Sequence, residues 1–584
     1  MDFRIYLLKV VSVIMLILSS SCGNFNEKNN EQFSSNSGVV IKEYDKHIVD
    51  NLSLLCMVWG FVKYYHPTLV QEKYNWDFEL FRILPTILHA KSKEDRNDLL
   101  YRWIKKLPEI HESKSFISVS LDSIKIYPDI KWIEEETELG DKLSKELIKI
   151  KHAERSYYRY AFIGMDENML TRTKTHFFCN ENIYSNISIS DVGFRLLSFF
   201  RYWNIIQYYY PYKYLIEEDW KNIIPEFIPQ IIDAKDKKEY CLVLLKLFSK
   251  IHDSHAFSNI DFEYDKELKY GLPARIKFVE GKALIISLED IKYVKKENVL
   301  RKGDLILEIN NIHVDSIVQE LLPFVPASNY STKLRNIARI LLRNEKDKIR
   351  VKYERDGEVL SDSIRLYPVS SFRVENPLSL KEPFEILPGN IGYLNLGSYG
   401  WKKEYGYARS NVPTSLSTKG LIIDLRIYPS KRVSGYKSYN LLYPQTTCVS
   451  KVTIGNALFP GLFVAFERNE EVGVDNLNYY KGKKIILVNE DTQSLGECLA
   501  MAYRRAPNSI VIGSTTAGAS GGMAKINLPG NIETNITFVG TYYPDGTETQ
   551  RIGIIPDIEV KPTIKGIRDG RDEVLEKAIQ LIQE

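Results

Sequence analysis

The sequence predicts a multi-domain α+β protein with a helical N-terminal repeat region, a β-rich middle unit and an α/β C-terminal unit. Its 584 residues exceed what one hydrophobic core supports. The hydrophobic spacing also changes along the chain, from helical periods near the start to short strands in the middle and alternating strands and helices at the end. The predicted signal peptide, polar linker, helical region, middle unit and C-terminal core span 1–21, 22–45, 46–262, 268–370 and 385–584.

The first segment has the composition of a signal peptide. Arg4 and Lys9 flank the start of an apolar run, Val10–Leu18, that is too short to span a bilayer. Small residues then precede Cys22 directly, which resembles a bacterial lipoprotein signal with Cys22 as the lipidated residue. An ordinary secretory signal cleaved nearby is the alternative. We therefore expect an exported protein of the cell envelope, anchored to the membrane by lipid and facing either the periplasm or the surface.

Charge and cysteine content argue against several classes of function. The formal net charge is +3 and no basic block resembles a nucleic-acid footprint, which argues against DNA or RNA as a partner. The other five cysteines are scattered, odd in number and without CxxC pairs, so we expect buried thiols rather than a disulfide framework or a zinc site. They are Cys56, Cys179, Cys241, Cys448 and Cys498.

The helical region contains an internal repeat. Apolar residues recur at helical spacing in both copies, which predicts two related helical subdomains joined by a more β-like insert over 116–187. One position differs in chemistry, because Lys114 of the first copy is replaced by His255 in the second. The matching segments are Trp59–Pro67 with Trp203–Pro211, Trp76 with Trp220, and Ile110–Phe116 with Ile251–Phe257.

The middle unit and the C-terminal core differ in their patterns. The middle unit holds short strand patterns, including KALIISL and GDLILEIN, and one helical stretch, Ser331–Arg343. The core opens with the strand patterns IGYLNL and LIIDLR and closes with an amphipathic helix, Asp572–Ile582. Asp424 and Arg426, at the end of LIIDLR, are expected to form a structural ion pair.

Within the core, one strand–turn–helix–strand unit carries a candidate nucleophile. The strand Ile485–Val488 leads through a polar turn to Ser494 at a helix start, and Ile510–Ile512 then ends in a Gly/Thr/Ser-rich loop. A serine at a helix start meets backbone N–H groups without intrahelical partners, so it can be a nucleophile with an oxyanion site beside it. The alternative is structural, because Ser494 and Glu497 form the S-x-x-E capping box.

The order of these motifs resembles the C-terminal-processing (tail-specific) and tricorn-core family of serine proteases. Gly303–Asn310 looks like the core of a PDZ domain, and the strand motifs, the Ser494 unit, GSTTAG and GIIPDIEV follow it in the family's order. The resemblance covers roughly 253–560. It implies a PDZ-like β domain followed by a ClpP/crotonase-like α/β protease core.

The resemblance also implies catalytic residues. Ser494 falls on the nucleophile, and the segment Asp253–His255 looks like the one that supplies histidine in the tricorn-like branch, with Ser254 in the same hydrogen-bond network. The other branch uses a serine–lysine dyad, but its lysine position falls on Ala519 here. His255 is therefore the better base, and Lys525, reached by a slip in register, is the alternative.

The remaining site positions depart from the family pattern. The tricorn-like branch places a glutamate where this chain has Gln550, and Glu548 lies two residues earlier on the same face of a strand. Glu548 could substitute for that glutamate, while Gln550 could orient a group through its amide oxygen. For the oxyanion, we expect the backbone N–H of Leu495 paired with that of Ser430, in a loop without the family's glycines.

These residues predict a serine endopeptidase that cleaves peptides or unfolded and C-terminal protein segments through an acyl-enzyme at Ser494. No metal or organic cofactor is implied. A different class remains open, a catalytically silent peptide-binding scaffold lipoprotein on the same fold, because Ala519, Gln550 and the glycine-free loop depart from the pattern. A weaker alternative is the binding of a hydrophobic small molecule in the groove.

Overall fold

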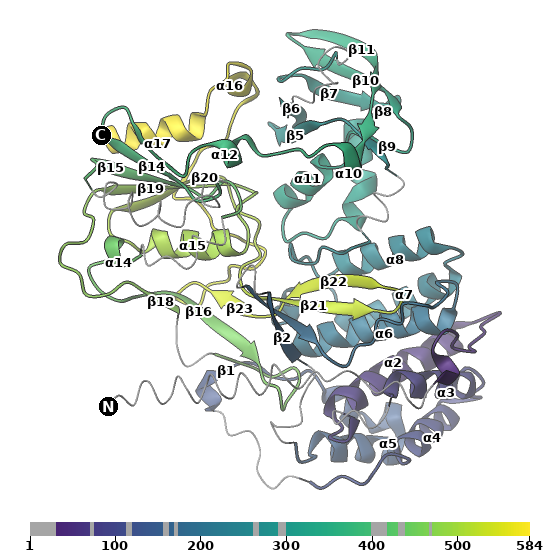
Figure 1. Ribbon diagram of the computed structural model, residues 1–584. Helices are drawn as coiled ribbons and strands as arrows, with labels where there is room; N and C mark the ends of the chain where they lie inside the picture. Colours follow the sequence, from purple (N-terminus) through teal and green to yellow (C-terminus); the bar gives the residue numbers. More distant parts are fainter. Residues whose placement is uncertain are drawn as a thin grey trace.

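The computed structural model has a mixed α+β fold with a helical N-terminal region and several sheets (Figure 1), as predicted. Cys22, Lys114 and Ser430 lie outside the residues that it describes. Within those residues, no helix combines the length and the apolar character needed to cross a membrane. The described residues are 31–69, 75–112, 120–155, 163–168, 173–260, 268–289, 299–398, 417–429, 439–465 and 470–584.

Seven helices of the N-terminal region pack around one aromatic-rich core at the lower right of Figure 1. Most of them begin at a residue whose side chain accepts a hydrogen bond from the first turn, such as Asp45, Asn75, Ser92 and Asp191. They are α2 (Lys46–Tyr65), α3 (Trp76–Leu88), α4 (Lys93–Ile104), α5 (Glu136–Lys151), α6 (Val192–Tyr209), α7 (Ile223–Asp233) and α8 (Lys237–Ser249).

The two copies of the repeat make the same contacts. The indole N–H of Trp59 donates to the carbonyl of Trp76 at 3.2 Å, and the indole N–H of Trp76 donates to the carbonyl of Trp59 at 3.0 Å. Trp203 and Trp220 exchange the equivalent pair at 2.8 and 3.0 Å. The matched tryptophans therefore hold the end of each long helix to the segment that follows it.

The insert between the copies is less β-like than the sequence analysis predicts. It contains α5, whose buried Leu139, Leu143, Leu147 and Ile150 recur at helical spacing. It also contributes three strands, two of which join segments of the C-terminal core. The strands are β1 (Ile124–Ile126), β2 (Ile163–Asn168) and β3 (Thr173–Phe178).

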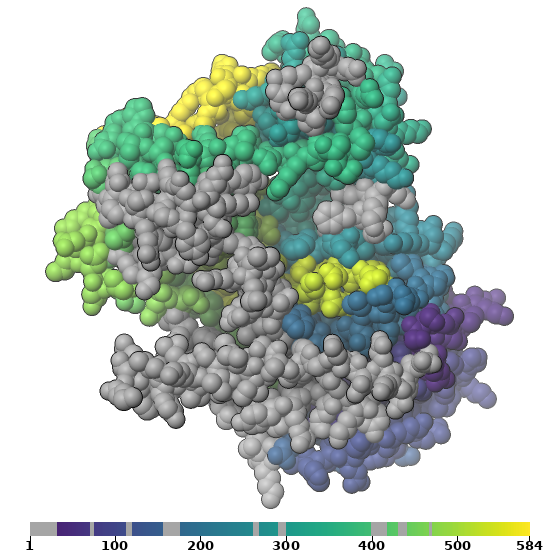
Figure 2. Space-filling model, in the orientation of Figure 1, coloured from purple at the N-terminus to yellow at the C-terminus, as the bar shows by residue number. Residues whose placement is uncertain are grey.

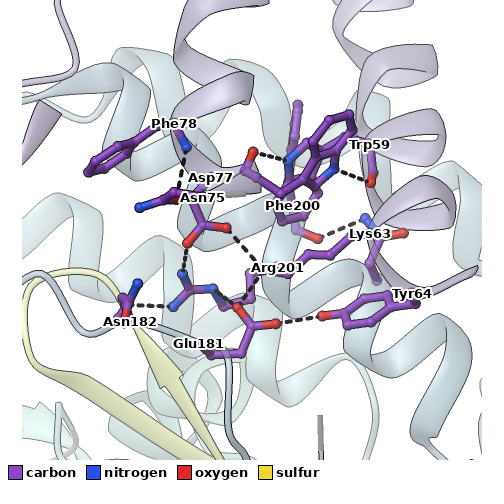
Figure 3. Close-up of polar contacts among 12 residues, drawn as sticks. Trp59, Lys63, Tyr64, Asn75, Asp77, Phe78, Glu181, Asn182, Phe200 and Arg201 are labelled. Atoms are coloured by element: carbon purple, nitrogen blue, oxygen red, sulfur yellow. Dashed lines mark hydrogen bonds and ion pairs between the residues drawn. The ribbon is translucent and has the colours of Figure 1, made fainter. Parts of the chain in front are cut away.

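A buried cluster of four charges lies between α2, α3 and α6 (Figure 3). Lys63 contacts Asp77 at 2.9 Å and Glu181 at 2.7 Å, and Arg201 contacts the same two carboxylates at 2.7 and 2.6 Å. Two cations thus balance two anions, and Tyr64 donates a further hydrogen bond to Glu181 at 2.9 Å. Because every ion has two opposite partners, the cluster offsets the cost of removing these charges from water.

The described residues of the middle unit form a six-stranded sheet, a small sheet of three short strands and two helices. The main path of the sheet runs β11-β10-β7-β6-β5, which leaves β5 at an edge, and α11 packs beside this edge strand. The predicted helix 331–343 is shorter than expected and appears as α11 (Tyr330–Ala338). The other elements are β5 (Ala274–Val279), β6 (Lys282–Leu288), β7 (Leu305–Ile309), β8 (Ile312–His313), α10 (Val314–Leu321), β10 (Lys348–Arg355) and β11 (Glu358–Arg365).

The C-terminal core is built on a second six-stranded sheet, drawn at the left of Figure 1. Its order is β13 (Phe384–Leu387), β14 (Ile391–Asn395), β15 (Gly420–Asp424), β19 (Lys483–Val488), β20 (Ser509–Gly513) and β24 (Ile558–Glu559). All pairs from β14 onward are parallel, with Ile422 opposite Ile485. The carboxyl ends of parallel strands share one edge, so the loops after β15, β19 and β20 meet there.

Helices cover both faces of this sheet. Alternate residues of each strand point to opposite faces. One set packs with α15 (Leu495–Arg504) and the other with α17 (Glu573–Gln583), which is the predicted C-terminal helix. Arg426 pairs with Asp424 at 2.7 Å, as predicted, and also with Asp572 at 2.6 Å.

One hairpin of the C-terminal core belongs to the helical core instead. Strands β21 (Met523–Leu528) and β22 (Ile532–Thr537) extend a sheet in the order β2-β3-β21-β22. Their residues Ala524, Ile526 and Ile536 are fully buried with side chains of the N-terminal helices. Figure 2 shows the yellow-green hairpin residues against the blue surface of the helical region. The hairpin therefore joins the C-terminal core to the helical N-terminal region.

A second strand pairing joins the same two regions. β1 pairs with β17, so the insert of the helical region joins a sheet of the C-terminal core. The elements not yet given are β4 (Tyr270–Gly271), β9 (Arg343–Asn344), β12 (Tyr367–Pro368), α12 (Pro377–Leu380), α14 (Tyr439–Leu442), β16 (Thr447–Gly455), β17 (Phe463–Ala465), β18 (Glu470–Val472), β23 (Gly540–Tyr542) and α16 (Ile564–Arg568).

Candidate active site

Ser494 is the N-cap residue directly before α15, at the end of the loop that follows β19. Its backbone has φ 54° and ψ −113°, a region that residues with a side chain rarely adopt. Its amide donates to the carboxylate of Glu497 at 3.0 Å, which is one half of the capping box, and to the carbonyl of Ala519 at 3.1 Å. A strained serine between a strand and a helix is typical of a nucleophile, because the surroundings must hold it there.

Glu497 supports the loop beside Ser494. Its buried carboxylate accepts hydrogen bonds from the Thr516 hydroxyl at 2.6 Å and from the amides of Gly518 and Ala519 at 2.7 and 3.0 Å. Burial raises the pKa of Glu497, and these hydrogen bonds oppose the rise. Gly518 has φ +69°, and a Cβ at this position would lie only 2.8 Å from the carbonyl oxygen of Arg551. The glycines of this loop therefore allow it to fold tightly beneath the serine.

The Tyr428 side chain lies at the start of α15, beside Ser494 and Leu495. Burial raises the pKa of Tyr428, while hydrogen bonds from the Ser494 side chain and the Leu495 amide to its hydroxyl oppose the rise. The neighbouring Pro429 packs 3.5 Å from the position that a Cβ on Gly496 would occupy. The hydroxyl of Tyr428 therefore lies near the Ser494 side chain and the Leu495 amide.

His255 is almost fully buried, with 1% of its surface exposed. Its Nδ1 lies 2.8 Å from the Thr537 hydroxyl, whereas its Nε2 is buried without a hydrogen-bond partner in the described structure. Burial lowers the pKa of His255 below its ordinary value, and the charge of Asp253 opposes this shift. The imidazole is therefore neutral near pH 7, which is the form a general base requires.

Asp253 is the buried acid nearest to His255. It accepts the His255 amide at 2.9 Å, the Thr537 amide at 2.7 Å, the Thr537 hydroxyl at 2.9 Å and the Gln550 amide nitrogen at 3.2 Å. The sequence motifs assign no role to Asp253 or Thr537. The proximity of Asp253 to His255 in sequence was a usable signal, but Thr537 is 282 residues away from His255 and gave none.

Ser254 and Gln493 connect the histidine segment to the serine loop. The Gln493 side chain donates to the carbonyl of Ser254 at 2.9 Å, and the Ser254 hydroxyl donates to the carbonyl of Ala517 at 2.8 Å. The Ser254 amide also donates to Ser328, at 2.9 Å, on the segment before α11. Ser254 therefore positions the segment. Ser494 and His255, both described, make no direct hydrogen bond, and catalytic bonds are often long before substrate binds.

The other predicted positions, at Gln550, Glu548, Ala519 and Lys525, have different surroundings. Gln550 reaches the acid through its amide nitrogen, and its amide oxygen is buried without a hydrogen-bond partner among the described residues, so it does not orient a group through that oxygen. Glu548 instead accepts a hydrogen bond from Tyr214 at 2.5 Å. Ala519 lies beside Ser494 as expected, but Lys525 is on β21 and pairs with Glu533 at 3.2 Å, away from the serine.

A cavity of about 1110 Å³ leads from the middle unit to this site. It is lined on one side by β5 and α11 and on the other by residues of the candidate active site, including Ser254, Tyr428 and Gln493. An edge strand beside a helix offers unpaired backbone groups to an extended chain. The cavity therefore joins the edge strand β5 with Ser254 and Gln493, the residues directly before His255 and Ser494.

The sequence and the fold match known peptidases. Residues 445–560 match the model of Peptidase family S41. The carboxy-terminal-processing protease of Bartonella bacilliformis is 25% identical over 227 residues, which are 35% of this chain and 49% of that protein. The chain thus spans about half the length of this curated relative.

Two solved structures, of mature CPAF complexed with lactacystin and of mature CPAF alone, have TM-scores of 0.53 at 14% identity. The likeness covers 68% of this chain in both cases, with 100% and 98% of the compared chains. At this identity it shows the fold alone. The matched region contains Ser494, Leu495 and Gln550, whereas His255 comes from the helical region outside it. The chain therefore carries a domain of peptidase family S41, a family of serine peptidases, and is a homologue of carboxy-terminal-processing proteases.

Proposed function

We propose that this protein is a serine endopeptidase that cleaves peptides or unfolded C-terminal segments, with Ser494 as nucleophile and His255 as general base. The observation that carries the proposal is that a strained serine at a helix start and a buried, neutral histidine, whose Nε2 has no hydrogen-bond partner in the described structure, lie on two segments joined by the Gln493–Ser254 hydrogen bond. Both features are costly unless they are used, and they are the two parts that acyl transfer requires.

The proposed reaction proceeds through an acyl-enzyme. Ser494 Oγ attacks the peptide carbonyl carbon while its proton passes to His255 Nε2. The C–N bond then breaks, and the leaving amine takes the proton from Nε2. A water molecule attacks the acyl group, gives a proton to Nε2 and releases the new carboxyl end, and the proton returns to Ser494. Every proton is thus accounted for without a metal or an organic cofactor.

The oxyanion of this reaction is proposed to bind at the start of α15. The Leu495 amide is the first donor, and Ser430 is proposed as the second. The N-terminus of a ten-residue helix adds a favourable partial positive charge. The substrate carbonyl must displace the Tyr428 oxygen, which now accepts from Leu495.

Substrate delivery and location are parts of the same proposal. We propose that the middle unit is a PDZ-like domain and that the core is ClpP/crotonase-like, so that an extended chain lies along the edge strand β5 and reaches Ser494 through the cavity. We further propose lipid attachment at Cys22 and residence in the cell envelope. The order of sequence motifs and the position of β5 at a sheet edge support this arrangement.

A fluorophosphonate probe tests the central claim. The purified protein should be labelled at Ser494, as mapped by mass spectrometry, and should cleave unfolded casein. Ser494→Ala and His255→Ala should each lower kcat/KM by about 10³-fold or more. The control is Ser361→Ala, which removes an exposed hydroxyl of β11. A folded protein with neither labelling nor turnover would support the peptide-binding scaffold instead.

A further inference from the structure

The acid beside His255 is held by a complete set of donors. Asp253 Oδ1 accepts from the His255 amide, the Thr537 hydroxyl and Gln550, while Oδ2 accepts from the Thr537 amide at 2.7 Å. The Asp253 side chain is fully buried. Only the ionised carboxylate can accept all four bonds, since a protonated carboxyl group would have to donate one. The site therefore holds a negative charge two residues before the histidine.

The Thr537 hydroxyl fixes which ring nitrogen of His255 carries the proton. This hydroxyl has one proton and lies 2.9 Å from Asp253 Oδ1 and 2.8 Å from His255 Nδ1. A carboxylate oxygen cannot donate, so the proton of Thr537 points to Asp253. Thr537 is then the acceptor toward His255, which requires Nδ1–H. The other nitrogen, Nε2, is left with its lone pair free, which is the tautomer that can take a proton from serine.

We propose that Asp253 and Thr537 together replace the acid that this chain lacks at residue 550. The Thr537 hydroxyl bridges the Asp253 carboxylate and His255 Nδ1, and we call this arrangement the relay. This inference rests on the proposed peptidase function. When Nε2 takes the proton of Ser494, the imidazolium keeps its Nδ1–H bond to Thr537, and Thr537 keeps its bond to Asp253. No proton moves along the relay. The negative charge of Asp253 stabilises the imidazolium across one hydroxyl group.

Gln550 and Glu548 have other places in this arrangement. An amide oxygen facing a carboxylate would be repelled, so the Gln550 side chain must present its nitrogen to Asp253, as it does at 3.2 Å. Gln550 thus holds the acid in position and is itself a positioning residue. Glu548 is bonded to Tyr214 instead. The acid of the relay therefore comes from the N-terminal half of the chain.

The titratable neighbours of the relay are tyrosines. Tyr202 on α6, and Tyr210 and Tyr212 just beyond it, face Asp253, and burial raises the pKa of each well above its ordinary value. They stay uncharged at working pH. Asp253 is the charged group that acts on His255 among the described residues, and it raises the pKa of His255 against the larger lowering by burial.

Substitutions at Thr537 test the relay. Thr537→Val keeps the shape and removes the hydroxyl, so we expect kcat/KM to fall by roughly 10- to 100-fold, as for other residues that orient a catalytic group. Thr537→Ser restores a hydroxyl and should recover activity to within a few-fold. Thr534→Val is the matched control, because Thr534 is a buried threonine of the same strand whose hydroxyl, among the described residues, bonds to the backbone carbonyls of Ala256 and Phe257. Equal activity of Thr537→Val and the control would overturn the relay.

The pH profile separates the relay from a merely structural role. In Asp253→Asn the loss of negative charge should move the acidic limb of kcat/KM to lower pH, together with a fall in kcat of about 10²-fold or more. An unchanged limb would contradict the proposal. If Asp253→Asn does not fold, the same comparison with Gln550→Glu decides, because a second carboxylate beside the relay should move the limb to higher pH.

A measurement without turnover keeps the relay distinct from the peptidase proposal. Nitrogen-15 NMR of the histidines, with His255→Gln to assign the signal, should show a protonated Nδ1 and an unprotonated Nε2 in the natural chain. The two tautomers should mix in Thr537→Val. An Nε2–H tautomer in the natural chain would overturn the relay even if fluorophosphonate labels Ser494. Failure of labelling with the expected tautomer would reject only the peptidase.

Discussion

At the scale of single residues, the structure leaves room for both roles that the sequence context of Ser494 allowed, helix cap and proposed nucleophile. Its amide and the Glu497 carboxylate form the helix cap, while its side chain contacts the Tyr428 hydroxyl. Capping uses the backbone of Ser494 in one direction, which leaves the hydroxyl for chemistry. The strained backbone, with φ 54°, is the residue-level sign that this position serves more than stability.

Tyr428→Phe should raise activity, because the Leu495 amide would no longer have a phenol oxygen as acceptor. A net hydrogen bond of about 0.5–1.5 kcal/mol corresponds to a gain of roughly 2- to 10-fold in kcat/KM and in the rate of fluorophosphonate labelling. Tyr127→Phe, an exposed tyrosine of the helical region, is the control. A loss of activity in Tyr428→Phe would show that the hydroxyl assists catalysis.

At the scale of elements, charges as well as apolar side chains join the helices of the N-terminal region. The cluster of Lys63, Asp77, Glu181 and Arg201 links α2, α3 and α6, and Arg201 also donates to the carbonyl of Asn527 on β21 at 2.8 Å. The same arginine therefore holds the hairpin whose other strand ends at Thr537. Loosening the cluster would act on the histidine through this hairpin.

Glu181→Gln should destabilise the fold strongly, since it leaves Lys63 and Arg201 with one carboxylate inside a dry core. Breaking a buried pair costs about 3–5 kcal/mol of unfolding free energy. Urea unfolding followed by circular dichroism measures this loss. In contrast, Asp50→Asn removes the exposed pair with Lys46 and should cost less than about 1 kcal/mol. Similar losses in both variants would contradict the role given to the cluster.

At the scale of the whole molecule, the candidate site exists only where three parts of the chain meet. His255 belongs to the helical region, Ser494 to the C-terminal core, and Ser328 and Arg335 to the middle unit. Arg335 on α11 donates to the carbonyl of Glu490 at 2.7 Å and to the side chain of Gln493 at 2.9 Å. Gln493 then bonds to Ser254, so the loop before the nucleophile is held from both sides.

Arg335→Met should therefore lower kcat by about 10-fold or more with little change in thermal unfolding, because it frees the loop before Ser494 without opening a core. Burial lowers the pKa of Arg335 to about 10, which still leaves it charged near pH 7. The control is Arg350→Met on β10, whose guanidinium bonds to Ser361 within the middle unit. Equal kcat values for the two variants would show that the loop does not depend on Arg335.

The sequence by itself determined the local features of this protein. Strand and helix periods placed β19, α15, β20 and α17, and the order of motifs predicted Ser494 as nucleophile and His255 as base, because these signals lie within short stretches of chain. The matched tryptophans, such as Trp59 and Trp203, marked the repeat for the same reason. The insert was misread because the helical spacing of α5 lies between short strands.

Only the tertiary structure decided what surrounds the reactive pair. Thr537 reaches His255 because the β21–β22 hairpin buries its apolar face, including Ile526 and Ile536, among the N-terminal helices. That docking comes from the hydrophobic effect, which is non-directional and leaves no motif at Thr537 itself. Asp253 becomes an acid of the site, and Glu548 a partner of Tyr214, for the same reason. The reactive residue types of the candidate site can thus be predicted from short stretches of sequence, while the geometry of the site depends on packing between distant segments.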